Sequence, residues 1–211
     1  MLMLKRRDWL LHCSLWAAAP LVVAAETEKR IVVLGDSLSA EYGLARGTGW
    51  VALLEQRLAA QRVNAKVVNA SISGDTTSGG RSRLTAVLKQ HKPSILVIEL
   101  GGNDALRGLP MAMSKDNLRA MTRAAKAAGA KVLLLGMQMP PNYGAAYGRE
   151  FAEVFEQVAK EEKAGLVPFL LKGVADRADA ESWFQSDRIH PLARAHPVML
   201  DNVWPALKPL L

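Results

Sequence analysis

The chain has 211 residues, of which 50% are hydrophobic and 22% charged, so it can bury the core of one large domain and is not a disordered polypeptide. Its one cysteine, Cys13, excludes an internal disulfide framework and any zinc site built from several cysteines. The net charge is +7, but the basic residues of the body are scattered and form no run, which argues against nucleic acid as a partner.

Residues 1–25 have the layout of a secretory signal peptide, with a basic start around Arg6 and Arg7, an apolar stretch and small residues up to Ala25. The paired arginines also resemble a twin-arginine export signal. An uncleaved anchor is the alternative, but the apolar stretch is shorter than the roughly 20 residues of a membrane span. We expect a mature domain over 26–211, without cysteine, in the periplasm or outside the cell, and no stable membrane insertion after cleavage.

Short apolar runs alternate with helical patterns along the rest of the chain. The runs predict strands at 31–34, 67–68, 95–98, 132–135 and 166–169. Apolar residues at helical spacing predict helices near 50–58, 81–89, 115–128, 151–158 and 199–207, and the segment 137–148 is expected to be a long loop. Because strands covered on both faces read as continuous apolar runs, this alternation predicts an α/β fold. We expect a single three-layer α/β/α sandwich around a parallel sheet of about five strands.

The turn after the first predicted strand lacks a nucleotide-binding pattern. It reads Gly-Asp-Ser-Leu-Ser over residues 35–39, which matches neither the glycine pattern of dinucleotide-binding folds nor that of the P-loop. The sequence therefore predicts no nucleotide cofactor, and we expect no other cofactor and no metal.

Residues suited to acyl transfer follow three different predicted strands: Ser37 the first, Gly74 the second and Asn103 the third. The carboxyl ends of parallel strands meet at one edge, and the last loop can bring Asp187 and His190 over that edge. A serine nucleophile needs a base, and His190 is the best candidate, with Asp187 three residues earlier to orient it. The N–H groups of Ser37 and Gly74 and the Asn103 amide are candidate donors to an oxyanion.

Each of these short patterns alone is more often a turn or a helix cap, but their order resembles the four sequence blocks of the SGNH, or GDSL-type, serine hydrolases. The stretch with Ser37 resembles the nucleophile block. Gly74 and Asn103 look like the oxyanion-hole residues of that family, and Asp187 with His190 looks like the block that completes its catalytic triad.

The resemblance covers residues from about 30 to 191 and implies the flavodoxin-like SGNH hydrolase fold. Three stretches, 68–76, 99–104 and 141–144, look closest to the bacterial periplasmic branch described as acyl-CoA thioesterase I, lysophospholipase or arylesterase. The expected activity is hydrolysis of carboxylic esters and thioesters of acyl chains through an acyl-enzyme on Ser37. The expected partner is such a small-molecule substrate, and we expect a monomer.

Three other functions remain open on the same fold: a carbohydrate O-deacetylase, an acyltransferase, and a catalytically silent carbohydrate- or lipid-binding module. Apolar residues in the segment after Asn103 and in the loop 137–148 favour acyl chains, although ordinary loop packing explains them as well. The residues expected to line the acyl pocket are Leu106, Leu109, Met111 and Met139.

Two residues depart from the pattern of the family that the chain resembles. Glu41 and Arg188 each stand where glycine is common. We expect Glu41 near the site entrance, where it would discourage anionic substrates, and Arg188 to attract a phosphate or carboxylate.

Overall fold

The computed structural model describes residues 28–211, so the predicted signal peptide lies outside the described residues. Five parallel strands form one sheet in the order β2-β1-β3-β4-β5. The strands are β1 Lys29–Gly35, β2 Ala65–Asn69, β3 Ile95–Glu99, β4 Lys131–Leu135 and β5 Gly165–Val167. The predicted parallel sheet is therefore confirmed, and the fully buried central strands explain why the sequence shows continuous apolar runs.

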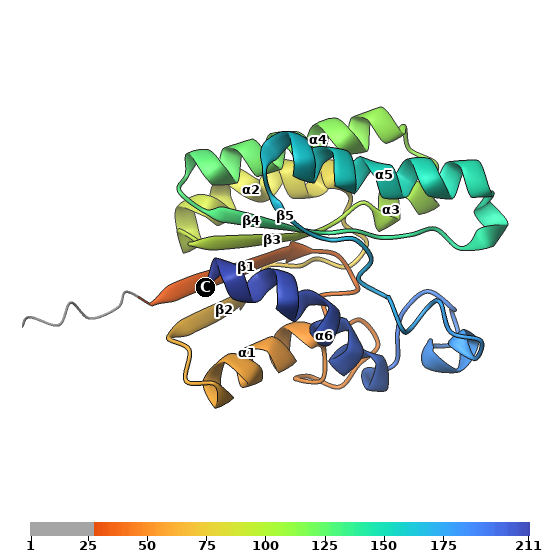
Figure 1. Cartoon of the computed structure of the whole chain (residues 1–211), viewed down its shortest axis with the longest axis horizontal. Helices are drawn as coiled ribbons and strands as arrows, with labels where there is room; N and C mark the ends of the chain where they lie inside the picture. The colour runs from red at the N-terminus through yellow and green to blue at the C-terminus, as the bar shows by residue number, and fades with distance from the viewer. Residues whose placement is uncertain (1–27) are drawn as a thin grey trace, which may run out of the picture.

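Helices cover both faces of the sheet and complete the predicted α/β/α sandwich (Figure 1). One face carries α1 Trp50–Ala60 and α6 His196–Leu207, and the other carries α2 Thr77–His91, α3 Gly102–Leu106, α4 Met111–Ala127 and α5 Ala145–Glu162. Short 3-10 turns are Pro141–Tyr143, Ala180–Trp183, Ala193–Ala195 and Lys208–Leu210. Within residues 28–211, no helix is long and apolar enough to cross a membrane.

The strand order creates a topological switch point at one edge of the sheet, the place where ligands of open parallel sheets bind in a crevice. The chain leaves β1 toward β2 on one side and leaves β3 toward β4 on the other, so the two connections diverge above the carboxyl ends of β1 and β3. The segment 168–195 lies at the same end of the molecule, on the right in Figure 1. Residues that follow β1 and β3 therefore lie side by side, at the same end of the molecule as that segment.

The second predicted helix, α2, begins earlier than the sequence pattern predicts. The helix expected from residue 81 begins at Thr77, and Thr76 caps it by accepting a hydrogen bond from the Gly79 N–H at 3.1 Å. The pattern failed because glycines disfavour helix on propensity alone. Gly80 is nevertheless needed there, since a Cβ at this position would lie 2.3 Å from Leu100 Cδ1. The absence of a side chain on Gly80 lets α2 pack closely on the sheet.

The segments predicted as loops near the site are partly helical. Residues 105–113 contain the end of α3 and the start of α4, which begins at Met111 rather than at residue 115. The expected loop 137–148 contains a 3-10 turn and the first residues of α5. The fifth strand ends at Val167 rather than at residue 169, because the regular ladder stops there: the Leu170 N–H, in place of the Phe169 N–H, donates to the Gly136 carbonyl at 2.9 Å.

Candidate active site

Ser37, His190 and Asp187 form a continuous chain of hydrogen bonds. Ser37 lies in the turn after β1, and its Oγ is 2.8 Å from His190 Nε2. His190 Nδ1 is 2.6 Å from Asp187 Oδ2. Because a carboxylate only accepts hydrogen bonds, Nδ1 carries the proton and Nε2 is left to accept the proton of the serine hydroxyl. The structure thus brings together three residues that the sequence predicts as partners.

Asp187 is held ionised by the loop in which it lies. Its Oδ1 accepts hydrogen bonds from the N–H groups of Ile189 at 2.9 Å and His190 at 3.0 Å. Burial raises the pKa of Asp187, but these N–H bonds and the imidazole outweigh burial and lower the pKa to about 2. The carboxylate therefore stays charged at neutral pH and can stabilise an imidazolium.

The loop with His190 is braced against the loop that follows β1. The Gln185 N–H donates to the His190 carbonyl at 2.8 Å, and Gln185 Nε2 donates to the Tyr42 carbonyl at 2.9 Å. The Tyr42 ring lies against the imidazole, with ring centroids 4.3 Å apart. Sequence reasoning missed Tyr42, because no local signal joins two residues that are 148 positions apart.

Three candidate hydrogen-bond donors lie on segments that follow three different strands. In the part of the chain that the structure describes, the N–H groups of Ser37 and Gly74 donate to no acceptor. Asn103 Nδ2 gives one of its two hydrogens to Asp36 Oδ2 at 3.0 Å, which leaves the other for a ligand. Gly74 has φ +79°, a conformation open to glycine, and Arg107 fixes its peptide by donating to the Gly74 carbonyl at 2.8 Å.

Two carboxylates beside these donors hold the loops in place. Asp36 Oδ1 accepts the Leu38 N–H at 3.0 Å. Asp104 accepts the backbone N–H of Thr77 at 2.8 Å and the hydroxyls of Thr77 and Ser114. Both carboxylates therefore support the turns and helix starts around them. Among residues 28–211, no group of three or more His, Cys, Asp or Glu side chains is arranged to hold a metal ion.

Residues 33–198 match the GDSL-like lipase/acylhydrolase family. The chain belongs to this family. Esterase TesA of Pseudomonas aeruginosa is 51% identical over 188 residues, 89% of this chain and 90% of that protein. Thioesterase 1/protease 1/lysophospholipase L1 of Escherichia coli K12 is 39% identical over 190 residues, 89% of this chain and 86% of that protein. The predicted family is confirmed, and the chain is a hydrolase of the esterase and thioesterase type.

Solved structures agree with this family assignment. The crystal structure of TesA has a TM-score of 0.83 at 53% identity, over 87% of this chain and 100% of that chain. The psychrotrophic esterase EstA from Pseudoalteromonas sp., solved with the inhibitor monoethylphosphonate, has a TM-score of 0.80 at 38% identity, over 86% of this chain and 97% of that chain. The expected SGNH hydrolase fold is therefore confirmed.

The four residues predicted to line an acyl pocket lie in two places: on the segment that follows Asn103 and on the loop after β4. Leu106 ends α3, Leu109 lies between α3 and α4, Met111 begins α4 and Met139 follows β4. All four are half-buried. Four large apolar side chains are exposed on loops that follow the carboxyl ends of strands, namely Tyr42, Ile72, Tyr143 and Ile189. Apolar surface is thus available around the crevice.

Glu41 and Arg188, where the family pattern has glycine, both have φ +59°, a region that glycine enters without strain. The Glu41 carboxylate is turned into its own loop, where it accepts the N–H groups of Gly47 at 3.0 Å and Gly49 at 2.8 Å. Its charge braces that loop, and the expected effect on anionic substrates stays a prediction. Arg188 is exposed, with its guanidinium 3.6 Å from Glu181.

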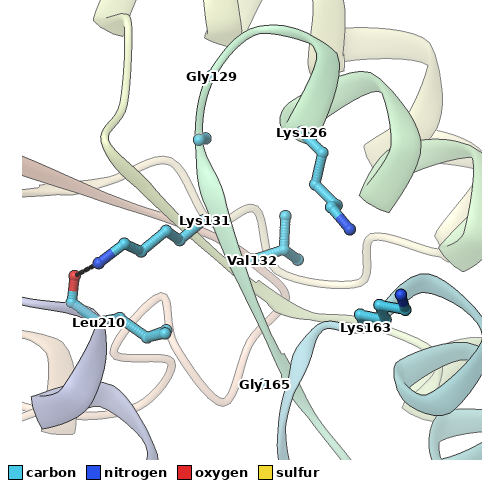
Figure 2. Close-up of a pocket in the computed structure, with 8 residues that line it drawn as sticks. Lys126, Gly129, Lys131, Val132, Lys163, Gly165 and Leu210 are labelled. Atoms are coloured by element: carbon cyan, nitrogen blue, oxygen red, sulfur yellow. Dashed lines mark hydrogen bonds between the residues drawn. The ribbon is translucent and has the colours of Figure 1, made fainter.

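A hollow of about 280 Å³ lies at the opposite end of the sheet, beside the amino ends of β4 and β5 (Figure 2). Lys131 Nζ donates to the Leu210 carbonyl at 2.7 Å, and Lys126 Nζ donates to the Glu162 carbonyl at 2.5 Å. Cations at the carboxyl ends of helices satisfy free carbonyls there. These lysines therefore have a structural use, far from the crevice.

Proposed function

We propose that this chain is an exported serine hydrolase that cleaves carboxylic esters and thioesters of acyl chains through an acyl-enzyme on Ser37. The observation that carries the proposal is the unbroken hydrogen-bond chain from Ser37 Oγ through His190 to Asp187, with contacts of 2.8 and 2.6 Å. A serine hydroxyl is a weak nucleophile until a base removes its proton, and this arrangement supplies that base.

The reaction proceeds in two halves that use the same groups. His190 Nε2 takes the Ser37 proton while Oγ attacks the carbonyl carbon. The tetrahedral intermediate then expels the alcohol or thiol, which leaves with the proton from His190. Water, deprotonated by His190, attacks the acyl-enzyme and releases the acid, and Ser37 recovers its proton. Asp187 holds the imidazole in the required tautomer and balances its charge in both halves.

The negative charge of each intermediate rests on three donors. They are the N–H groups of Ser37 and Gly74 and the free Nδ2 hydrogen of Asn103. Donors fixed before the reaction need no reorganisation when the charge develops, and one of them is typically worth about 10²–10³ in kcat. No cofactor takes part in any step.

Acyl chains are the substrate class that the apolar surroundings favour. We propose that Leu106, Leu109, Met111 and Met139 form walls of the acyl pocket, since they border the segment of Asn103 and the loop after β4. The relatives are named an esterase and a thioesterase/lysophospholipase, which supports both esters and thioesters. Phosphonate inhibition of EstA supports a serine nucleophile that organophosphorus reagents can modify.

Replacement of the nucleophile tests this function. Ser37→Ala should abolish both turnover of p-nitrophenyl esters and labelling by a fluorophosphonate, and it should leave thermal unfolding unchanged because Ser37 lies in a turn at the sheet edge. Ser82→Ala, on an exposed position of α2, is the matched control and should behave as wild type. A Ser37→Ala protein that keeps its esterase rate after purification would show that the nucleophile is another residue.

A substrate panel tests the acyl-chain preference. Esters from short to long acyl chains, run beside acyl-CoA and lysophospholipid, should show rates that rise beyond acetyl. Rates confined to acetyl esters would instead favour a carbohydrate O-deacetylase, and transfer to added glycerol in place of acid release would favour an acyltransferase.

Export rests on the sequence of residues 1–25. We propose that this segment is removed and that the mature protein is a monomer in the periplasm or outside the cell. Mass spectrometry of the exported protein should give an amino terminus at Glu26. A full-length chain retained in the membrane fraction would contradict the proposed cleavage.

A further inference from the structure

Two carboxyl groups are buried directly beneath the turn that carries Ser37. Asp36 is 3% exposed and Glu99, the last residue of β3, is 1% exposed. Glu99 Oε2 accepts the Ser39 hydroxyl at 2.8 Å and the Asp36 N–H at 3.3 Å. Glu99 pairs with Gly35 across the sheet, and a Cβ on Gly35 would lie 2.8 Å from Glu99 Oε2. The missing side chain of Gly35 therefore makes the space that Glu99 occupies.

Among the residues that the structure describes, the charge of these two groups has no compensating cation. Within residues 28–211, no lysine or arginine forms an ion pair with Asp36 or Glu99. Arg83 reaches the Gly35 carbonyl at 3.4 Å, but its charge is paired with Asp75 at 2.8 Å. Two like charges buried side by side without a counter-ion strongly disfavour joint ionisation, so one of the two carboxyls keeps its proton.

The surrounding donors favour Glu99 as the carboxyl that keeps the proton, because Asp36 accepts two N–H groups at 3.0 Å, whereas Glu99 accepts one hydroxyl and one longer N–H contact of 3.3 Å. Burial raises the pKa of Asp36 to about 6. Hydrogen bonds with Leu38, Glu99 and Asn103, and the nearby His190, lower this pKa but do not cancel the effect of burial. Burial and then the charge of Asp36 raise the pKa of Glu99 well above its usual value, and Ser39 lowers it only in part. The protonated Glu99 can donate to the Asp36 carboxylate, which lies within its hydrogen-bonding reach.

Asp36 links the nucleophile to the oxyanion site. Its Oδ1 accepts the N–H of Leu38, next to Ser37, at 3.0 Å, and its Oδ2 accepts the Asn103 side-chain amide at 3.0 Å. An ionised Asp36 serves both donors. A proton on Asp36 would put a hydroxyl opposite one of them, and that contact would be lost.

We propose that Asp36 and Glu99 are positioning residues that share a single proton, carried by Glu99, and that this pair fixes the Asn103 amide relative to Ser37. This inference rests on the proposed function. With the single proton on Glu99, both carboxylate oxygens of Asp36 can accept hydrogen bonds, one from the Leu38 N–H and one from the Asn103 amide. A second negative charge close to the oxyanion site would oppose the charge that develops there, and Glu99 prevents it by staying neutral.

The test compares three variants by kcat and KM on one p-nitrophenyl ester. Glu99→Leu removes the proton and both hydrogen bonds, and should lower kcat roughly 10- to 100-fold with KM unchanged, part of the loss expected for an oxyanion donor. Glu99→Gln mimics the protonated acid and should restore kcat to within about threefold of wild type, with the same pH profile. Thr122→Val, equally buried on α4, is the control for general destabilisation and should keep wild-type kcat.

Infrared spectroscopy locates the proton without relying on activity. Wild type at about pH 8 should show a carboxylic-acid carbonyl band that is absent from Glu99→Gln. Absence of that band in wild type would overturn the proposal, as would wild-type kcat in Glu99→Leu, a loss of tenfold or more in Glu99→Gln, or an equal loss in Thr122→Val. If Glu99→Leu does not fold, the Gln variant and the infrared band still decide.

Phosphonate titration of active sites separates this inference from the proposed function. All rates are expressed per titrated site, so wild type must first react with the phosphonate through Ser37. A wild type that neither reacts nor hydrolyses esters refutes the proposed function. If wild type reacts with the phosphonate and hydrolyses esters, but a variant or the infrared band gives one of the contrary results, only the proposed role of Asp36 and Glu99 is refuted.

Discussion

The two halves of the candidate site are built in different ways. The nucleophile half consists of turns that leave the buried strands β1 and β3, and its supporting carboxyls are almost completely buried. The acid–base half lies on the segment 168–195, where the side chains of His190 and Asp187 are 16% and 36% exposed. Its only ladder contact is an isolated bridge between Phe184 and Pro191. Changes in the buried supports of the first half should therefore affect both stability and catalysis, and changes in the second half mainly catalysis.

The largest effect is expected from His190→Ala. Without its base, Ser37 is not activated, and kcat should fall by at least about 10⁴, as for loss of a triad histidine. The free energy of unfolding should stay within about 0.5 kcal/mol of wild type, because the imidazole packs on the surface ring of Tyr42 and not on the core. Ester kinetics and urea unfolding measure the two quantities. Strong destabilisation would mean that the loop with His190 is part of the cooperative core.

Gly35→Ala should show the opposite behaviour in the nucleophile half. The added Cβ would lie 2.8 to 2.9 Å from Glu99 Oε2, Ser39 Oγ and Ser71 Oγ, so buried groups must shift. Overpacking of this kind costs about 1–3 kcal/mol, and it also moves the turn that carries Ser37. We expect a lower urea midpoint together with a lower kcat. Gly47→Ala is a control, since a Cβ there meets no atom within 4 Å, although its φ of +85° adds local strain.

The same division explains what the sequence could predict. Strand runs and the residues directly after them depend on local pattern and on the geometry of parallel sheets, so Ser37 and Asn103 were placed correctly at one edge. The sequence shows Glu99 only as part of a motif, because its burial depends on Gly35 of β1 and on Ser39 in the turn after β1. Tyr42 was missed for the same reason: its contact with His190 exists only in the folded chain.

A smaller and pH-dependent effect is expected at His196, the first residue of α6. This residue is 2% exposed, and its Nδ1 accepts the Trp50 N–H at 3.0 Å. Burial lowers the pKa of His196 below its usual 6.5, although the Pro191 carbonyl and Glu41 oppose this. The unfolded chain therefore takes up the proton first, and stability is lost as pH falls below about 6.5.

The variant His196→Asn separates this titration from others. Its amide oxygen can still accept the Trp50 N–H, but it has no proton to gain. Between pH 7 and pH 5, the free energy of unfolding of wild type should fall relative to that of the variant. The raised pKa of Asp36 acts in the opposite direction, and it is present in both proteins, so it cancels in the difference. A constant difference across this range would show that His196 does not titrate on unfolding.

The smallest effect should come from Arg188→Gly, within the loop of the acid–base half. An L-residue at φ +59° is strained by roughly 1–2 kcal/mol, and glycine removes this strain while it adds about 0.5–1 kcal/mol of unfolded-chain entropy. The exposed contact with Glu181 contributes little. The net gain in stability should thus lie between about 0 and 1.5 kcal/mol. Arg188→Ala loses the same guanidinium but keeps the Cβ, so the difference between the variants isolates the backbone. If kcat also differs between the two variants, the backbone conformation at residue 188 controls the position of the His190 side chain. The acid–base half then depends on a strained turn two residues from its catalytic base.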